Sequence, residues 1–185
     1  MPRPRSHSAF SLSTLAQAWG DTAFRSIPII CHGRRRRGIS KTRFIELAGE
    51  INSAMPYHVV SSVSKALNQQ GKALKGSEVL VLGVAYKKDI DDLRESPALT
   101  IIELLQKDGA QVSYNDPYFP LIGKGRHYDL QMKCVPVGDV SKYDCVLIVT
   151  DHSDYDYVWI AQHASLVVDT RNAMRGIQGD NIVRC

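Results

Sequence analysis

The sequence predicts an α/β fold in which helices flank a mostly parallel sheet and a helical segment precedes it. Two observations lead to this prediction. Residues 79–82 and 145–149 are unbroken apolar runs, the pattern of strands that are buried on both faces. Segments with helical periodicity separate the predicted strands, and this alternation is typical of βαβ units with parallel strands. The expected architecture is therefore Rossmann-like.

The length and composition are those of an ordinary globular chain. Of the 185 residues, 44% are hydrophobic and 23% are charged, which excludes collagen-like and wholly disordered proteins. A chain of this length buries about 70% of the surface that its unfolded form exposes, so its core requires neither a metal nor a disulfide. We expect one domain, or one domain with an appendage.

The first 41 residues differ from the rest in charge. They hold eight Lys or Arg residues and one acid, whereas the remaining residues hold 15 Lys or Arg and 18 Asp or Glu, a net charge of −3. We interpret residues 1–41 as a basic, disordered or unrelated extension. The alternative is that the run Arg34 to Arg37 contacts phosphate, but no aromatic residues interleave it to stack on single-stranded nucleic acid. No nucleic-acid partner is therefore expected.

Residues 42–74 have helical periodicity. Apolar residues recur at helical spacing on both sides of Pro56, which predicts either two helices or one helix kinked at that proline. Gly71 ends this helical segment. Residues 75–185 are expected to form the sheet domain, whose first strand, 78–82, is bounded by Gly83.

The elements after Gly83 alternate between strands and helices. Pro97 starts a helix that ends at Asp108-Gly109, with Pro in the first turn and Gly past the end. The loop after residue 116 is rich in Gly and Pro. The remaining predicted elements are strands at 111–115, near 134–137, at 145–150, at 166–169 and at 181–184, and a helix near 155–163.

The cysteines and the apolar segments exclude several classes. The four cysteines are scattered without a C-x-x-C motif, so neither a zinc site nor a disulfide framework is expected. Cys145 lies in an apolar run and is interpreted as a core residue. No apolar stretch approaches the roughly 18 residues that cross a bilayer. We expect a cytoplasmic protein with no metal and no membrane partner.

Charged side chains follow the ends of two predicted strands. Lys87, Lys88 and Arg94 follow the first strand, and Arg171 follows the strand at 166–169. The carboxyl ends of the strands are where open α/β sheets bind ligands, so these cations suit an anion. The loop after Gly83 has one glycine where a dinucleotide fingerprint needs three, so it is a poor cradle for a pyrophosphate. The alternative is a solvated loop whose charges pair among themselves.

The loop after the strand at 145–150 reads Asp151-His152-Ser153-Asp154. No nucleophile is paired with it in the sequence. We interpret Asp151 or Ser153 as the cap of the following helix and His152 as a residue with a merely local role.

Several motifs in order indicate a family. They are Lys87-Lys88-Asp89, Asp92-x-Arg94-Glu95-Ser96-Pro97, Tyr114-x-Asp116-Pro117-Tyr118, Thr150-Asp151-His152 and Asp169-Thr170-Arg171-Asn172. With them, residues 42–185 resemble the C-terminal, UDP-binding domain of the UDP-glucose/GDP-mannose dehydrogenase family. The residues of these motifs are most similar to those of bacterial enzymes that act on UDP-N-acetylglucosamine or UDP-glucose. Residues 42–60 resemble the end of that family's central helical domain.

The resemblance implies an oxidoreductase of polysaccharide biosynthesis that oxidises the sugar 6-hydroxyl of UDP-N-acetylglucosamine or UDP-glucose to a carboxylate. Two NAD molecules accept the hydrides, and a cysteine thiol forms the thiohemiacetal and the thioester. The resemblance also implies that Tyr86, Lys87 and Arg171 contact the nucleotide sugar and that Arg94 reaches the NAD.

The sequence departs from the family in its first part. The family's NAD-binding domain and the segment with its catalytic cysteine are missing, and Cys31 does not reproduce that cysteine's setting. We therefore expect a truncated chain with no catalytic residue, in which NAD would be bound mainly by the missing domain. The alternative is a non-catalytic interaction or homo-oligomerisation module that uses the helices of residues 42–74.

Overall fold

The computed structural model describes residues 43–125 and 128–185. The chain divides into two compact units, Met1–Ala54 and Met55–Cys185. The basic segment 1–41, with its arginine run and Cys31, lies outside the described residues. Within the described part of the chain, no helix is both long enough and apolar enough to cross a bilayer.

Helix α3, Arg43–Gln69, is a single helix that contains Pro56. The sequence left open two helices or one helix kinked at Pro56, and the structure has a single helix that passes through this proline. The helix ends at Gly71, which has a φ of 73°. The amide of Gly71 donates to the carbonyl of Asn68 and that of Lys72 to the carbonyl of Leu67, so a Schellman motif closes the helix as the glycine predicted.

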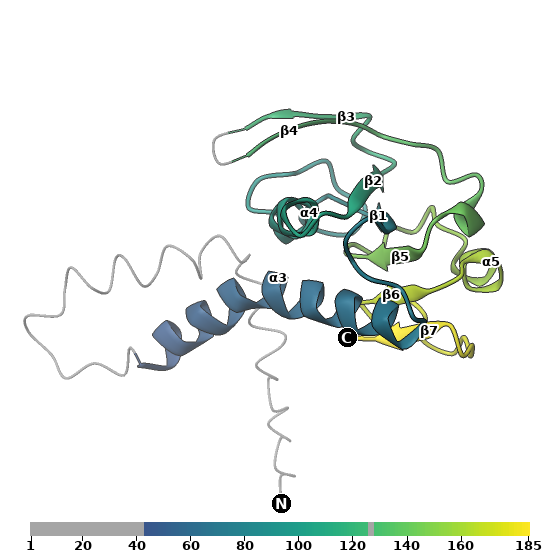
Figure 1. Ribbon diagram of the computed structural model, residues 1–185. Helices are drawn as coiled ribbons and strands as arrows, with labels where there is room; N and C mark the ends of the chain where they lie inside the picture. The colour runs from purple at the N-terminus through teal and green to yellow at the C-terminus, as the bar shows by residue number, and fades with distance from the viewer. Residues whose placement is uncertain (1–42, 126–127) are drawn as a thin grey trace, which may run out of the picture. The chain divides into compact units, whose positions relative to one another are not determined.

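A five-stranded parallel sheet forms the centre of the second unit (Figure 1). Its strands lie side by side in the order β2-β1-β5-β6-β7, which confirms the mostly parallel sheet. Their bounds are Gln111–Asn115 for β2, Glu78–Leu82 for β1, Cys145–Ile148 for β5, Val167–Asp169 for β6 and Ile182–Arg184 for β7. The two apolar runs of the sequence are thus the two central strands, β1 and β5.

Alternate residues of the central strands face two separate apolar clusters. Val79 and Val81 lie in one cluster with the buried residues of helix α4, Pro97–Lys107. Leu80 and Leu82 lie in the other with those of helix α5, Tyr157–His163. Figure 1 accordingly shows α4 and α5 on opposite sides of the sheet. This coverage explains why both strands are apolar without alternation.

The region between β2 and β5 differs from the prediction of a loop followed by a strand near 134–137. It contains an antiparallel hairpin of β3, Leu121–Lys124, and β4, Asp129–Lys133. Cys134 forms only an isolated bridge with Tyr114. The strand β4 alternates exposed and half-buried residues, because only one of its faces packs against the protein. A short alternating strand beside glycines gave a weaker signal than the apolar runs.

Helix α5 begins two residues later than expected. Its N-cap is Asp156, whose side chain accepts the amide hydrogen of Trp159 at 2.9 Å. The prediction that Asp151 or Ser153 caps this helix is therefore wrong. Both residues lie in the loop that joins the end of β5 to Asp156, and Ser153 has another partner there, described below.

Candidate functional site

The strand order reverses between β1 and β5. The chain passes from β1 outward to β2 on one side, whereas β5, β6 and β7 extend the sheet on the other side. In open parallel sheets, ligands bind at such a reversal, in the crevice beyond the carboxyl ends of the strands. We therefore define the candidate site by the loops that follow β1, β2, β5 and β6. The Lys87 loop is the segment 83–95, which follows β1.

Gly83 starts the Lys87 loop where it passes the end of β5. Its φ is +77°, and a Cβ at this position would overlap the carbonyl oxygen of Thr150. Only glycine fits both the backbone conformation and this close approach. The hydroxyl of Thr150 then donates to the carbonyl of Ala85 at 2.7 Å, which ties the loop to β5.

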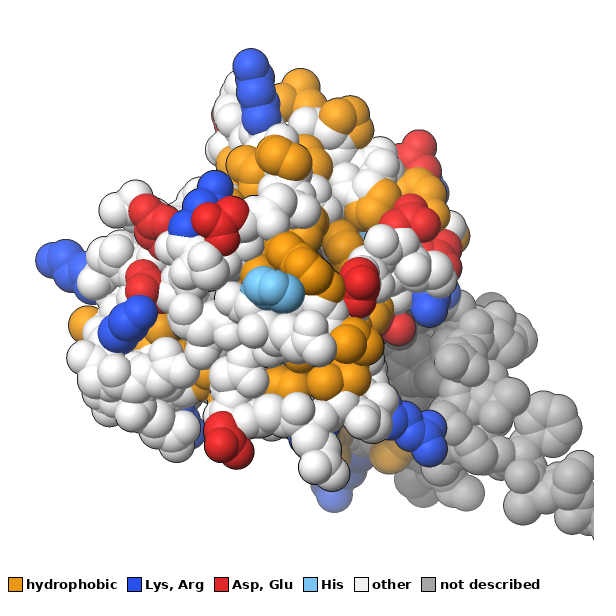
Figure 2. Space-filling model, turned by 90° about the vertical axis from the view of Figure 1, so that its right-hand side faces the viewer, with side chains coloured by type: hydrophobic (Ala, Val, Ile, Leu, Met, Phe, Trp, Pro, Cys, Tyr) orange, Lys and Arg blue, Asp and Glu red, His pale blue; other side chains and the backbone are white. Residues whose placement is uncertain are grey.

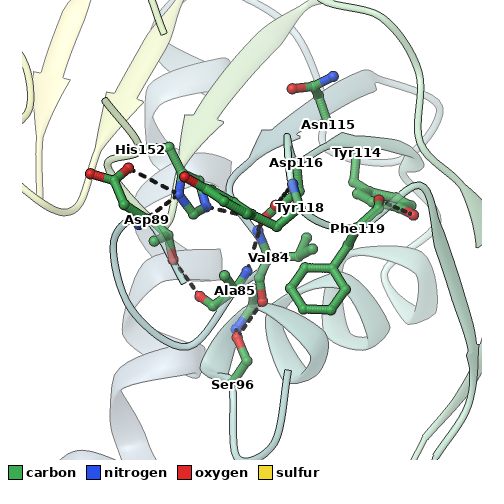
Figure 3. Close-up of polar contacts among 12 residues, drawn as sticks. Val84, Ala85, Asp89, Ser96, Tyr114, Asn115, Asp116, Tyr118, Phe119 and His152 are labelled. Carbon is green, nitrogen blue, oxygen red and sulfur yellow. Dashed lines mark hydrogen bonds and ion pairs between the residues drawn. The ribbon is translucent and has the colours of Figure 1, made fainter. Parts of the chain in front are cut away.

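Asp116, at the end of β2, holds the start of the Lys87 loop (Figure 3). One of its carboxylate oxygens accepts the amide hydrogens of Val84 at 2.7 Å and Ala85 at 2.9 Å. The same oxygen lies 3.1 Å from Nε2 of His152. The other oxygen accepts the amide hydrogen of Tyr118 at 2.9 Å. The carboxylate, which is fully buried, is thus satisfied by four donors.

His152 connects Asp116 to the far side of the Lys87 loop. Its side chain is fully buried, and Nδ1 accepts the amide hydrogen of Asp89 at 3.0 Å. An Nδ1 that accepts a hydrogen bond carries no proton, so the hydrogen of a neutral imidazole is on Nε2, which donates to Asp116. The rings of Tyr118 and Tyr155 pack against the imidazole at 5.1 and 5.9 Å between centroids.

Asp89 forms a second link to the loop after β5. Its carboxylate accepts both the amide hydrogen of Ser153 at 2.8 Å and the hydroxyl of Ser153 at 2.7 Å. These two bonds hold the pKa of Asp89 below its usual value, the amide bond contributing most. The residue has a φ of 57°, a left-handed conformation that aspartate tolerates better than most residues.

Two tyrosines complete the buried surroundings of His152. The hydroxyl of Tyr155 donates to the carbonyl of Asn115, and that of Tyr157 donates to the carbonyl of His152, both at 2.9 Å. Burial raises the pKa of both hydroxyls above the usual range. They are therefore neutral hydrogen-bond donors at any physiological pH.

Tyr86 and Lys87 lie between the two points where the loop is held, and both are half-buried. The ammonium of Lys87 lies 5.3 Å from the centre of the Tyr86 ring, within the range of a cation–π contact. Within the described ranges 43–125 and 128–185, no carboxylate lies within 4.0 Å of this ammonium. The Lys87 charge is thus not neutralised by a neighbouring acid of the described chain.

Arg171 lies in the turn that follows β6, at the same edge of the sheet. Asp169 organises this turn by accepting the amide hydrogens of Arg171, Ala173 and Met174. The Arg171 side chain is 45% exposed, and its Nε lies 3.6 Å from a carboxylate oxygen of Asp151. The strands β1 and β6 are separated by β5 alone, so the two loops start about 10 Å apart.

Arg94 is held differently from Lys87. Its guanidinium makes two hydrogen bonds of 3.0 Å to the carboxylate of Asp92, and its side chain is 88% exposed. These bonds lower the pKa of Asp92. The sequence left open that the charges of this loop pair among themselves, and Arg94 does pair with Asp92 in this way. Lys87 instead lies near the ring of Tyr86.

The roles of Asp116 and His152 were not predicted from the sequence. The interpretation of His152 as merely local is wrong, because its imidazole bonds to residues 36 and 63 positions away. The sequence offered one indication, which is position: Asp116 directly follows β2, and His152 follows β5 by a few residues. Polar groups that are buried at such strand ends require hydrogen-bond partners. Which of these groups pair could not be known before the strands were placed.

A hollow of about 570 Å³ lies elsewhere, between α3 and α4. Its lining residues are Tyr57, Val60, Ser61, Ser64, Lys65, Leu104, Lys107 and Asp108. Because it reaches the last turn of α4, directly before β2 begins, it lies toward the amino ends of the strands and includes none of the predicted site residues. Among the described residues, no group of three or more His, Cys, Asp or Glu side chains is arranged to hold a metal.

Comparison with known proteins identifies the family. The model described as "UDP-glucose/GDP-mannose dehydrogenase family, UDP binding domain" matches residues 80–176, just over half of the chain. The chain belongs to this family. The match runs from β1 past the turn of Arg171, so it contains every loop of the candidate site.

Individual members of the dehydrogenase family show the same relationship. A UDP-N-acetyl-D-mannosamine dehydrogenase of Methanococcus maripaludis is 30% identical over 73% of this chain and 31% of its own length. A UDP-glucose 6-dehydrogenase of Rhizobium meliloti is 29% identical over 60% of this chain and 26% of its own length. The solved UDP-D-ManNAc dehydrogenase of Pyrococcus horikoshii has a TM-score of 0.61 at 25% identity, covering 80% of this chain and 34% of that one.

The chain therefore spans about a third of the length of the curated dehydrogenases that it matches. Its own Lys87 loop does not fit the pyrophosphate of a dinucleotide. The amides of Val84 and Ala85, which would have to face such a ligand, already donate to Asp116, and the space beside Gly83 is filled by Thr150. The amides of residues 84 and 85 are therefore not available to an anion, whereas the side chains of Lys87 and Arg171 at the same edge carry the opposite charge.

Proposed function

We propose that this chain is the C-terminal, UDP-sugar-binding part of an NAD-dependent UDP-sugar 6-dehydrogenase. The observation that best supports this is the position of the Lys87 and Arg171 loops, at the carboxyl edge of a parallel sheet and beside the reversal of strand order. The family match to a UDP-binding domain covers both loops. The domain boundaries we propose are 42–74 for the helical segment and 75–185 for the binding domain.

The chemistry of the ligand agrees with these side chains. A diphosphate carries negative charge that an ammonium and a guanidinium can bind together, and the guanidinium adds a planar, two-pronged geometry. We assign the diphosphate to Lys87 and Arg171, and a further contact with the nucleotide sugar to Tyr86. In this proposal the ligand is UDP-N-acetylglucosamine or UDP-glucose. UDP-N-acetyl-D-mannosamine should be tested beside them, because a relative is named for that sugar.

The oxidation itself is assigned to the parts of the family that this chain does not contain. We propose no catalytic residue in these 185 residues and expect no turnover from the chain alone. Arg94 is proposed to reach the NAD, for which it must leave Asp92. The cytoplasm is the proposed location, and the free thiols of Cys134, Cys145 and Cys185 suit a reducing compartment.

Calorimetric titration of the full chain with UDP tests the proposal. We expect measurable binding, which Lys87→Ala and Arg171→Ala each weaken by about 1.5–3 kcal/mol, the contribution of a charged hydrogen bond. Lys133→Ala, which removes a lysine from β4, is the control and should bind as the unaltered chain does. An absence of heat and of any thermal shift at millimolar UDP contradicts the proposal.

The second candidate function is an interaction or oligomerisation module. It is favoured by an apolar stripe on the first part of α3, where Phe44, Leu47 and Ile51 share one face and are 64, 52 and 55% exposed. We expect sedimentation to show a dimer that Leu47→Glu dissociates, because a charge would be buried in the contact. A monomer at high concentration rules this candidate out.

A further inference from the structure

His152 contacts both of the points at which the Lys87 loop is held. The loop is held at Ala85 by Asp116 and Thr150, and it is held again at Asp89 by His152 and Ser153. Lys87 lies midway, two residues from each of these points. The imidazole of His152 bonds to both anchors, through Nε2 to Asp116 and through Nδ1 to the amide of Asp89 (Figure 3).

The imidazole has no other visible use in the site. It is fully buried, and Tyr118 and Tyr155 cover it, so it does not face a ligand. The titratable groups around it are Asp89, Asp116, Tyr118 and Tyr155, and the hydroxyl of Tyr157 binds its backbone carbonyl. A buried group with both nitrogens engaged has its position fixed, and it fixes its partners in return.

We infer that His152 is a positioning residue, whose imidazole fixes the two anchors of the Lys87 loop and thereby holds the Lys87 ammonium where the diphosphate of UDP binds. This inference rests on the proposed function. It adds a residue that itself touches no ligand, and it explains why a histidine follows β5 at a position with no solvent access.

An exposed variant tests the anchor without disturbing the core. Asp89→Ala removes the carboxylate that accepts two bonds from Ser153. Loss of a negative charge alone would strengthen the binding of an anion, whereas a loosened anchor weakens it. We expect the affinity for UDP to fall about two- to tenfold, the range of one or two hydrogen bonds. Asp91→Ala, an exposed aspartate of the same loop, is the matched control and should leave the affinity unchanged or slightly raised.

A double-mutant cycle tests whether His152 acts through Lys87. His152→Gln keeps an amide donor for Asp116 and loses the acceptor for the amide of Asp89, and it should weaken UDP binding about two- to tenfold. His152→Asn, which keeps an acceptor near the position of Nδ1, should restore part of the loss. In the Lys87→Ala background, His152→Gln should weaken binding no further, because coupled residues are not additive.

The outcomes separate this inference from the proposed function. If the unaltered chain does not bind UDP, the proposed function fails, and amide hydrogen exchange still tests the anchor. The amides of residues 86–89 should then exchange faster in His152→Gln than in the unaltered chain. If UDP binds but the losses from His152→Gln and Lys87→Ala simply add, or if Asp89→Ala binds UDP more tightly, the inference is overturned. Unchanged exchange in His152→Gln overturns it as well.

Discussion

At the scale of single residues, the sequence showed which side chains could bind an anion but not how they are held. Lys87 and Arg171 could be selected because each follows a predicted strand, and strand ends can be located from apolar runs. The pairing of Asp116 with His152 could not, because it joins residues 36 positions apart and depends on β1 lying between β2 and β5. Buried polar contacts of this kind follow from the strand order, which a single sequence leaves open.

Gly83 gives a direct test of the close approach between β1 and β5. We expect Gly83→Ala to lower the free energy of unfolding by about 3 kcal/mol or more, since it adds overlap with Thr150 to an unfavourable positive φ. Urea denaturation measures the change.

Two other glycines separate these causes. Gly71 also has a positive φ but no atom within 4 Å of an added Cβ, so Gly71→Ala should cost only about 1 kcal/mol. Gly138 has neither feature, and Gly138→Ala should leave stability unchanged. Equal losses for Gly71 and Gly83 would show that the contact with Thr150 contributes nothing.

At the scale of elements, local signals located the helix ends more reliably than the short strands. Ser96-Pro97 begins α4 and Gly71 closes α3, because capping is determined by neighbouring residues. The hairpin of β3 and β4 was not predicted, because both strands are short and their alternation of exposed and buried residues gives only a weak signal in the sequence. The start of α5 was placed too early because several residues before it can cap a helix. Ser153 is bonded to Asp89 instead, and Asp156 is the cap.

Ser96 links the cap of α4 to the candidate site. Its hydroxyl donates to the carbonyl of Val84 at 2.7 Å and also accepts the amide hydrogen of Ala98. We expect Ser96→Ala to cost about 2 kcal/mol, about 1 for the cap and the rest for the buried carbonyl left without its donor. Thermal denaturation checks this, with Ser61→Ala on the exposed face of α3 as the control, expected to be neutral. A loss no larger than that of Ser61→Ala would show that Ser96 does not cap the helix.

At the scale of the whole molecule, the sequence predicted the sheet and its covering helices, and it also predicted the resemblance to the C-terminal domain of a longer dehydrogenase, which the family match confirmed. The chain spans about a third of its curated relatives. On the face of the described residues drawn in Figure 2, Lys and Arg are interspersed with Asp and Glu rather than gathered in one basic area. An ion pair between such exposed charges contributes little to stability, about 0–1 kcal/mol.

The ion pair between Asp144 and Lys72 predicts how the stability of the chain depends on pH. Its carboxylate lies 2.6 Å from the ammonium of Lys72 and accepts the amide hydrogen of Glu78 at 2.8 Å. The Lys72 bond first, and the Glu78 bond second, lower the pKa of Asp144. A lowered pKa means that the contribution to stability is complete above the ordinary aspartate pKa of about 3.9 and disappears as the pH falls through the folded-state value.

We therefore expect Asp144→Asn to destabilise the chain by about 1 kcal/mol near neutral pH, a modest value because both side chains are partly exposed. The difference from the unaltered chain should vanish as both are acidified. Urea denaturation at several pH values measures it, with Asp129→Asn, from the more exposed pair with Lys124, as a control expected within about 0.5 kcal/mol. A difference that persists at low pH would contradict the assignment.

The anchoring of the Lys87 loop by Asp116 also matters for engineering. The carboxylate binds the backbone of residues 84 and 85, and His152 binds the backbone of residue 89, so none of these bonds uses a side chain of residues 86–88. Because the hydroxyl of Tyr86 is buried, positions 87 and 88 are the two that can be changed without altering these bonds or a buried side chain. A designer who wants this scaffold to recognise a different anion can change these two residues and keep the bonds that hold the loop.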